Sequence, residues 1–304
     1  MKQAIIDIGS NSIRLTLYET KDQDFRILFK EKDIAGLASY VEDGKLTSEG
    51  IECACASLLT FQSTLKALEI DNVHVFATAS LRNVSNSQQA LTLIQAATGL
   101  DVEIITGQEE ALLGYSGAMK ELHLSSGAFM DIGGASTEVV TFDNGRPIDY
   151  ASYPVGSLSL YHNCVKNILP GNGSVKKIKK SIDEAISFDE KSEPLLVAVG
   201  GTARAALKFA KNYFKLSKDT RCITVNQLDQ LCEFFCSGKK QASELILKLE
   251  PERIHTLVPG LLILQQVLHK FNAQQLVISK YGVREGYLCQ RILKNNIITP
   301  KTEN

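Results

Sequence analysis

Two stretches of the sequence repeat one arrangement of acidic and small residues that is suited to binding phosphate. In each, an aspartate ends an apolar run and a glycine follows two positions later, as Asp7 and Gly9 and again as Asp131 and Gly133. Glycine permits a turn whose backbone N–H groups point inward, with no side chain in the way of an anion. Each stretch therefore predicts a strand, a phosphate-binding turn and a second strand.

Polar side chains in both turns add hydrogen-bond donors to these predicted phosphate sites. The candidate phosphate-binding residues are Gly9, Ser10, Asn11, Ser12 and Arg14 in the first hairpin, and Gly133, Gly134, Ser136 and Thr137 in the second. A carboxylate next to bound phosphate is tolerable mainly when a cation or its water shell lies between the two. Asp7 and Asp131 therefore indicate that a cation takes part in binding.

One hairpin of this kind would be an ordinary turn, because Gly and Ser dominate turns in general. Here residues 4–19 align without a gap on residues 128–143, an offset of 124 positions (131 − 7). That offset is too long for a solenoid repeat and suits two duplicated domains that face each other across a cleft. A chain of 304 residues is also long enough to favour two domains over one.

A further glycine-rich turn lies in the second half of the chain. Gly200, Gly201 and Thr202 follow the apolar run at 195–199 and precede a predicted helix. A strand, a glycine pair and a helix N-terminus form an anion-binding arrangement. We therefore add these three residues to the candidate phosphate-binding set.

Two acidic residues and one arginine are candidates for the reaction itself. Glu109 and Glu110 follow Gly107 at the start of a predicted helix. They either complement the helix dipole or place one carboxylate to deprotonate an attacking water. Arg82 is either a surface residue or a fork that binds phosphoryl oxygens and neutralises developing charge. Together with the glycine turns, this set predicts phosphoryl transfer to water or to a hydroxyl group.

The elements that must position these residues alternate between strands and helices. Besides the hairpins, strands are expected near residues 25–30, 73–78, 102–106, 148–153, 195–199 and 275–279. Helices are expected from Thr47 or Ser48 to about Leu68, from Asn86 and Ser87 to Ala97, from Gln108 to Leu122, from Ser157 to Leu169, from near Pro251 to Phe271, and from Arg284 onward, with a turn at 79–83. This alternation predicts α/β domains with mixed or mostly parallel sheets covered by helices.

Composition excludes several classes of protein. The chain has 44% hydrophobic and 22% charged residues and a net charge of −1, which is typical of an ordinary globular protein without a nucleic-acid-binding arm. The absence of a signal-peptide pattern and of a bilayer-spanning run predicts a cytoplasmic protein that does not bind membranes, and seven scattered cysteines fit reduced thiols.

One short basic run has two interpretations. It is either a solvated helix face or a surface that helps to hold a polyanion, and it contains Lys176, Lys177, Lys179 and Lys180. The oligomeric state stays open, a homodimer included.

The motifs resemble those of one known family, the exopolyphosphatase and guanosine pentaphosphate phosphohydrolase (Ppx/GppA) family of the actin-like superfamily. The resemblance runs in order through residues 7–15, 78–83, 105–111, 131–138, 154–157, 199–202 and 279–286, and so covers nearly the whole chain. It implies two duplicated actin-like (ribonuclease H-like) domains with an interdomain cleft. The domains are expected at 1–122 and 123–287, with a closing helix at about 288–298 packed back on the first.

The resemblance also implies an activity and roles for individual residues. The chain is expected to use Mg²⁺ or Mn²⁺ and to remove terminal phosphate from inorganic polyphosphate or from pppGpp. Glu110 matches the catalytic base of the family, and Arg82 matches its phosphate-binding arginine. Asp131 and Glu138, with Asp7, are expected to bind the metal or its water.

The sequence departs from the family pattern at three places. Ala135 replaces a usual third glycine, and His255 stands where an aspartate is common in an Arg-x-Asp element. The chain is also expected to lack the C-terminal helical extension of longer members, and therefore to hold long chains less processively. A pppGpp hydrolase, a sensor that binds polyphosphate or a nucleotide without turnover, and a kinase of the same superfamily remain as alternatives to an exopolyphosphatase.

Overall fold

The structure, a computed structural model, describes residues 1–188 and 192–294 and divides the chain into two compact units. Unit 1 contains Met1–Glu110 and the described residues from Tyr287 to Lys294, and unit 2 contains Ala111–Gly286. The boundary between the units thus falls at Glu110, inside a helix, where the sequence analysis expected it at residue 122. Residues 295–298 of the predicted closing helix lie outside the described residues.

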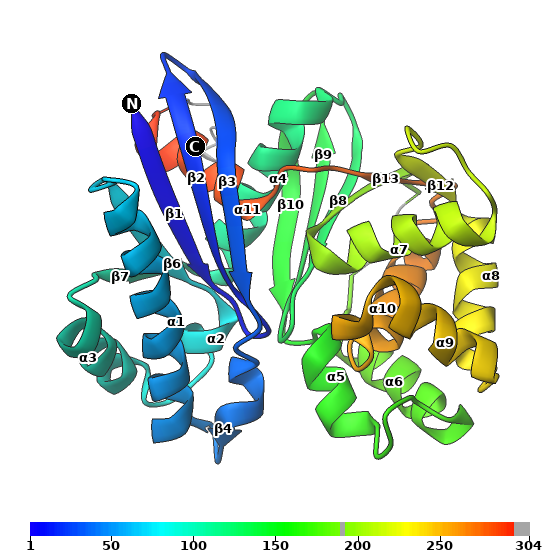
Figure 1. Cartoon of the computed structure of the whole chain (residues 1–304). Helices are drawn as coiled ribbons and strands as arrows, with labels where there is room; N and C mark the ends of the chain where they lie inside the picture. The colour runs from blue at the N-terminus through cyan, green and yellow to red at the C-terminus, as the bar shows by residue number, and fades with distance from the viewer. Residues whose placement is uncertain (189–191, 295–304) are drawn as a thin grey trace. The chain divides into compact units, whose positions relative to one another are not determined.

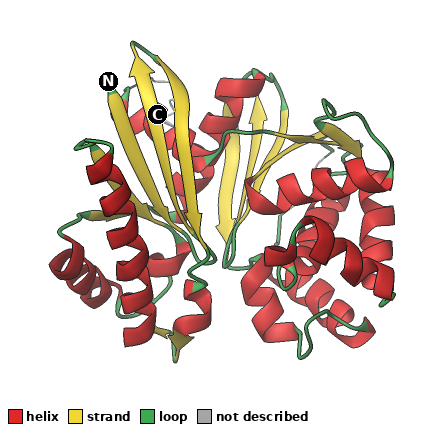
Figure 2. Ribbon diagram, in the orientation of Figure 1, coloured by secondary structure: helices red, strands yellow, loops and turns green. Residues whose placement is uncertain are grey.

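Unit 1 is built on a five-stranded mixed sheet with the order β3-β2-β1-β6-β7, drawn in yellow in Figure 2. Its strands are β1 (Lys2–Ile8), β2 (Ile13–Lys21), β3 (Asp24–Asp33), β6 (Val73–Ala77) and β7 (Val102–Ile104). Strands β1, β2 and β3 form an antiparallel meander, whereas β1, β6 and β7 run parallel. The carboxyl ends of these three parallel strands therefore meet at one edge of the sheet.

Helices cover the unit 1 sheet because their apolar stripes pack on it. The remaining elements are η1 (Leu37–Tyr40), β4 (Val41–Glu42), β5 (Lys45–Leu46), α1 (Ser48–Ala67), α2 (Ala79–Arg82) and α3 (Ser87–Thr98). Helix α1 begins as predicted, since the Thr47 side chain accepts a hydrogen bond from the Gly50 N–H. Figure 1 shows α1 beside α3, and the two helices are in contact.

The last described segment also packs on unit 1. It contains the end of α11 (Val283–Tyr287) and the π-helical turn η3 (Leu288–Ile292). The Tyr287 ring stacks on Phe76 with 4.9 Å between ring centroids, and its hydroxyl donates to Glu103 at 2.7 Å. An aromatic contact and a hydrogen bond thus fix this segment to strands β6 and β7.

Unit 2 repeats the architecture with a six-stranded sheet of order β10-β9-β8-β11-β13-β12. Its strands are β8 (Gly127–Ile132), β9 (Thr137–Asp143), β10 (Arg146–Tyr153), β11 (Leu195–Val199), β12 (Cys222–Thr224) and β13 (Gln275–Ile278). An antiparallel meander again joins parallel strands, here β8, β11 and β13. The predicted α/β class with mixed sheets is confirmed in both units.

Helices lie on both faces of the unit 2 sheet. They are α4 (Gly107–Leu122), whose first residues belong to unit 1, α5 (Ser157–Cys164), α6 (Asn172–Ala185), α7 (Gly200–Tyr213), α8 (Val225–Cys236), α9 (Lys240–Leu249), the short η2 (Pro251–Arg253) and α10 (Leu257–Lys270). Helix α10 is almost entirely buried and contacts α5, α6, α7 and α8. On the other face, Tyr115 of α4 packs against Phe129 and Phe142 of the sheet.

Four local predictions were wrong. Residues 79–82 form the short helix α2 instead of a turn. Asn86 precedes α3, but its side chain bonds to the backbone of Leu46 and does not cap the helix. The helix expected to reach Leu169 ends at Cys164, where Val165 is already extended. The helix expected near Pro251 begins only at Leu257, after a 3₁₀ turn.

Candidate functional site

The glycine turn of unit 1 is tight and shaped by one backbone hydrogen bond. The Gly9 N–H donates to the Ser12 carbonyl at 3.2 Å, and a Cβ atom on Gly9 would lie 3.0 Å from that oxygen. Glycine is therefore favoured here by the close approach of the backbone, and its own N–H donates within the turn. Ser10 and Ser12 are buried, and Asn11 is half-buried between them.

Neighbouring loops hold this turn in place. The carbonyl groups of Ser10 and Asn11 accept hydrogen bonds from the N–H groups of Ala38 and Gly36, at 2.9 and 3.0 Å. The Ser80 hydroxyl of α2 donates to the carbonyl of Ile8, at the end of β1, at 2.6 Å. The turn that follows β1 and the helix that follows β6 are therefore fastened to each other at the carboxyl edge of the sheet.

The structure separates the roles of the two neighbouring glutamates. Glu109 accepts hydrogen bonds from the N–H and hydroxyl of Thr106, and the Glu109 N–H donates to that hydroxyl, so the two residues form a capping box. Its other oxygen accepts from Arg291. Burial acts to raise the pKa of Glu109, but the bonds from Thr106 and the pairing with Arg291 outweigh it and lower that pKa. Glu109 thus has the helix-terminal role that the sequence left open for either residue.

Glu110 instead pairs with Arg82. The Arg82 Nη1 atom donates to Glu110 Oε2 at 2.8 Å and to the Ile105 carbonyl at 3.1 Å. Both side chains are largely buried, with exposures of 17% for Arg82 and 10% for Glu110. Because Nη1 makes both bonds, the Nε and Nη2 groups of Arg82 are left to donate to a phosphoryl group.

The glycine turn of unit 2 repeats the hydrogen bond of unit 1. The Gly133 N–H donates to the Ser136 carbonyl at 2.9 Å, and a Cβ on Gly133 would lie 3.1 Å from that oxygen. The carbonyl groups of Gly133 and Gly134 accept from the first N–H groups of α5, those of Ser157 and Leu158, at 3.0 and 2.9 Å. The predicted duplication is therefore present in the geometry of the turns as well as in the sequence.

The charges that face each other across the two hairpins differ. In unit 1 the register of β1 and β2 places Asp7 opposite Arg14, and in unit 2 the register of β8 and β9 places Asp131 opposite Glu138. Residues in register share one face of an antiparallel pair. The first hairpin therefore pairs an acid with a base, whereas the second pairs two acids.

The acidic pair in unit 2 suits a divalent cation. Glu138 is buried, with 1% exposure, and accepts a hydrogen bond from the Ser152 hydroxyl at 2.7 Å. Mg²⁺ is commonly bound by one or two carboxylates, with water and substrate phosphate as further ligands, so the donor set of Asp131 and Glu138 fits this ion. Within residues 1–188 and 192–294, no group of three or more His, Cys, Asp or Glu side chains forms a metal site on its own. Asp7 belongs to the other unit.

The third predicted glycine turn is closely packed. Gly200 begins α7 with φ +82°, and a Cβ on it would overlap the Asp131 carboxylate. A Cβ on Gly201 would overlap the guanidinium group of Arg253. Thr202 is buried, with its side chain against Gly260. At the carboxyl end of β11, the Asp131 carboxylate and the Arg253 guanidinium therefore pack directly against the backbone of Gly200 and Gly201.

Three arginines near this turn were not assigned a role from the sequence. Arg204 lies within electrostatic reach of Arg253 and Arg284, and also of Asp131 and Glu285. Arg253 belongs to the Arg-x-His element, and Arg284 to the last family motif, so the signal for both was present in the pattern. Several guanidinium groups next to one acidic site can neutralise a polyanionic substrate.

Glu121 fixes the loop of residues 279–282, which leads into α11 and Arg284. Its carboxylate accepts hydrogen bonds from Arg221 and from the Lys280 N–H, both at 2.7 Å, and from the Ser279 hydroxyl at 2.8 Å. Burial acts to raise the pKa of Glu121, but these bonds outweigh it and lower that pKa to about 2. Helix α4 packs closely against this loop, since a Cβ on Gly117 of α4 would overlap the carbonyl of Gly282.

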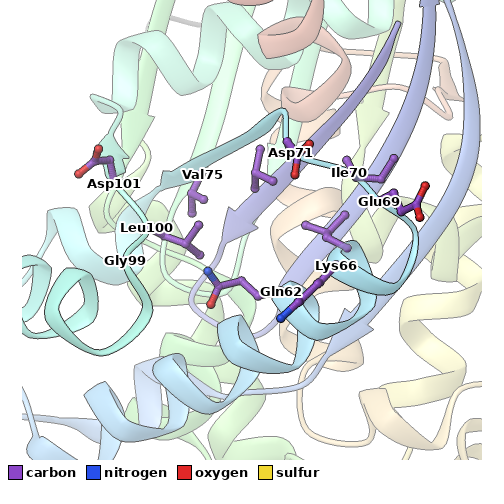
Figure 3. A pocket seen from close by; sticks show the side chains of 11 residues that line it. Gln62, Lys66, Glu69, Ile70, Asp71, Val75, Gly99, Leu100 and Asp101 are labelled. Atoms are coloured by element: carbon purple, nitrogen blue, oxygen red, sulfur yellow. The ribbon is translucent and has the colours of Figure 1, made fainter.

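A separate pocket of about 750 Å³ lies in unit 1, near the amino-terminal ends of β6 and β7. Figure 3 shows Gln62 and Lys66 of α1 on one side of it, and Gly99 and Leu100 from the loop after α3 on another. None of the predicted site residues lines this pocket. It therefore lies away from the glycine turn, which follows the opposite end of the parallel strands.

In the described part of the chain, none of the helices combines the length and the apolar character needed to cross a membrane.

Comparison with known proteins identifies the family. The model of the Ppx/GppA phosphatase family matches residues 16–295. The chain is 26% identical to a Pseudoalteromonas translucida protein named guanosine-5'-triphosphate,3'-diphosphate pyrophosphatase, over 98% of this chain and 61% of that protein. It is 22% identical to exopolyphosphatase 1 of Mycobacterium bovis, over 96% of this chain and 88% of that protein.

Solved structures agree with this result. The crystal structure of the Aquifex aeolicus member of the Ppx/GppA family is 26% identical and superposes with a TM-score of 0.78, covering 97% of this chain and 99% of that one. The predicted actin-like fold class is thereby confirmed.

Proposed function

This chain belongs to the Ppx/GppA phosphatase family, and from that premise we propose that it is an exopolyphosphatase that releases terminal orthophosphate from inorganic polyphosphate. It is accordingly a phosphoric anhydride hydrolase. The observation that carries the proposal is the buried pair of Glu110 and Arg82, at the edge of the sheet where the Gly9 turn also lies. A carboxylate and an arginine next to a phosphate-binding turn are the groups that phosphoryl transfer to water requires.

In the proposed reaction, Arg82 binds the terminal phosphoryl group through Nε and Nη2 and stabilises the negative charge of the transition state. Glu110 orients the attacking water and accepts its proton as the new P–O bond forms. The anhydride P–O bond to the rest of the chain breaks, so orthophosphate and a polyphosphate shorter by one unit are the products. The bond between Arg82 Nη1 and Glu110 keeps the guanidinium aimed before substrate arrives. This preorganisation reduces the rearrangement needed at the moment of reaction.

We propose that Asp131 and Glu138, with Asp7, hold Mg²⁺ or Mn²⁺ or its water. Such a cation neutralises phosphate charge when it is bound. Arg204, Arg253 and Arg284 supply further positive charge around Asp131. These groups would offset the repulsion between the acidic pair and a polyanionic substrate.

Both units are proposed to act on one substrate chain, with the predicted domains 1–122 and 123–287 each supplying a glycine turn. The support is that Gly9 and Gly133 make the same hydrogen bond, to Ser12 and to Ser136. In this proposal the glycines provide room for phosphate, and the donors are the neighbouring N–H and hydroxyl groups, including those of Gly200–Thr202 in unit 2.

The test is a side-by-side measurement of kcat/KM for long-chain polyphosphate and for pppGpp, with Mg²⁺ and with Mn²⁺. An exopolyphosphatase prefers polyphosphate. A preference for pppGpp would assign the pyrophosphatase activity named for the Pseudoalteromonas translucida relative. Tight binding of either without phosphate release would identify a sensor, and formation of ATP from polyphosphate and ADP would identify a kinase.

A further inference from the structure

Helix α6 (Asn172–Ala185) carries its charges in the order opposite to the one that stabilises a helix. Lys176, Lys177, Lys179 and Lys180, here called the α6 lysines, lie in its first ten residues, and Asp183 and Glu184 lie near its end. The positive end of the helix dipole is at the N-terminus, so cations there are unfavourable and acids would be favourable. Lys176 and Lys177 lie just after the first turn and Lys179 and Lys180 just past the middle of the helix, so the four lysines extend positive charge from the N-terminal end along α6.

The N-terminus of α6 also has no side-chain cap on its first backbone N–H groups. Gly171 precedes the helix without any side-chain hydrogen bond to the first turn, and that turn contains no acidic residue. A Cβ on Gly171 or Gly173 would meet nothing within 4 Å, and neither residue has a positive φ. Packing and conformation therefore do not require these glycines, whose effect is to leave the first N–H groups of α6 open to an anion.

The α6 lysines are exposed while the opposite face of the helix is anchored. Ile178 and Ile182 are fully buried in the core of unit 2. Lys176 and Lys180 lie one turn apart on the exposed face, and the Lys180 side chain remains 77% exposed although its Nζ is 3.5 Å from Glu184. The two ammonium groups are thus accessible to a partner in solution.

Helix α5 connects this basic surface to the glycine turn of the same unit. The first N–H of α5, that of Ser157, donates to the Gly133 carbonyl, and at its other end the Asn163 carbonyl accepts from Lys177 at 2.6 Å. Figure 1 shows α5 and α6 side by side, and the two helices are in contact. Eight helical residues span about 12 Å, so the α6 lysines begin roughly one short helix away from the phosphate-binding turn.

We propose that the N-terminus of α6 and the α6 lysines bind the distal part of a long polyphosphate chain whose terminal phosphates occupy the glycine turn of unit 2. This inference rests on the proposed function and adds a second contact region for that substrate. A linear polyanion matches a row of exposed ammonium groups and open N–H groups. Helix α6 contains no aromatic residue on which bases could stack, which favours polyphosphate over single-stranded nucleic acid. Tripolyphosphate and pppGpp carry too few linked phosphates to reach α6.

The test uses the double variant K176E/K180E, which retains Lys177 and its bond to α5. The matched control is K240E/K248E on α9, which makes the same charge change at exposed lysines of the same unit and likewise removes an ion pair, between Lys240 and Glu244. We expect KM for long-chain polyphosphate to rise roughly tenfold in K176E/K180E and its dependence on salt to weaken. The KM for tripolyphosphate should stay at the wild-type value, and the control should change neither.

Three results would overturn the inference. Equal KM values for long-chain polyphosphate in the two double variants would remove α6 from the substrate path. A parallel rise in KM for tripolyphosphate would show a general effect of charge on the site. If the wild-type protein hydrolysed no substrate, the proposed function would fail, but direct binding of labelled long-chain polyphosphate to the same variants would still decide on α6. A single-stranded RNA that bound α6 as tightly as polyphosphate would show that the assigned partner is wrong.

Discussion

The carboxylate of Glu110 lies 2.8 Å from the guanidinium of Arg82, while its neighbour Glu109 is held by Thr106 and Arg291. Two adjacent glutamates of one helical turn thus have different partners because consecutive helical residues point about 100° apart. Substitution of each glutamate should therefore have a different consequence.

Replacing Glu110 by Gln is expected to lower kcat for phosphate release by roughly 10²–10⁴-fold, because an amide cannot accept the proton of the attacking water. The side chain keeps its size, and its oxygen can still accept from Arg82. Single-turnover phosphate release with saturating substrate measures the loss, and circular dichroism reports on folding. Near-native turnover in a folded variant would reject Glu110 as the base.

Replacing Glu109 by Gln should affect stability more than catalysis. The change weakens the capping box with Thr106 and removes the ion pair with Arg291, at a cost of about 1 kcal/mol of unfolding free energy. Because the folded state lowers the pKa of Glu109, its contribution is present above the pKa of the unfolded chain, about 4.3, and is lost as pH falls below it. Urea unfolding at pH 7 and at pH 4 measures both effects. A large loss of kcat with unchanged stability would instead assign the base to Glu109.

Glu121 should make stability depend on pH over a defined range. Its pKa is about 2 in the folded protein and about 4.3 in an unfolded chain, so folding is favoured by the ionised form. The contribution, roughly 2–3 kcal/mol, is complete above about pH 5.5 and disappears as pH falls towards 2. The difference in unfolding free energy between wild type and Glu121→Gln should therefore shrink through this range. A difference that stayed constant with pH would show that the carboxylate charge is not what stabilises the loop.

Replacing Gly117 by Ala should destabilise the protein by about 3 kcal/mol or more, because the new methyl group overlaps the Gly282 carbonyl, which is backbone and cannot turn away. Gly173→Ala is the matched control on another helix, where the methyl group meets nothing within 4 Å. Thermal unfolding of the two variants measures the contrast, and similar melting temperatures would contradict the packing of α4 on this loop.

The sequence predicted those parts of the site that are local in the chain. Both glycine hairpins, the strand before Gly200 and the helix that begins with the two glutamates could be read from short patterns of residues. The roles of the glutamates could not be separated in this way, because Arg82 and Arg291 lie far from them in the sequence. Arg253 stands in a recognisable Arg-x-His element, but its place against Gly201 could not be predicted, since only the folded chain brings its guanidinium there.

The opposition of Asp7 to Arg14, and of Asp131 to Glu138, shows how far two copies of one hairpin can diverge. Their backbones keep a common shape, but Arg14 in the first hairpin corresponds to Glu138 in the second. The opposed pair is therefore neutral in the first hairpin and carries two negative charges in the second. The two hairpins therefore share a backbone conformation but differ in charge, so one could not replace the other in binding an anion or a cation.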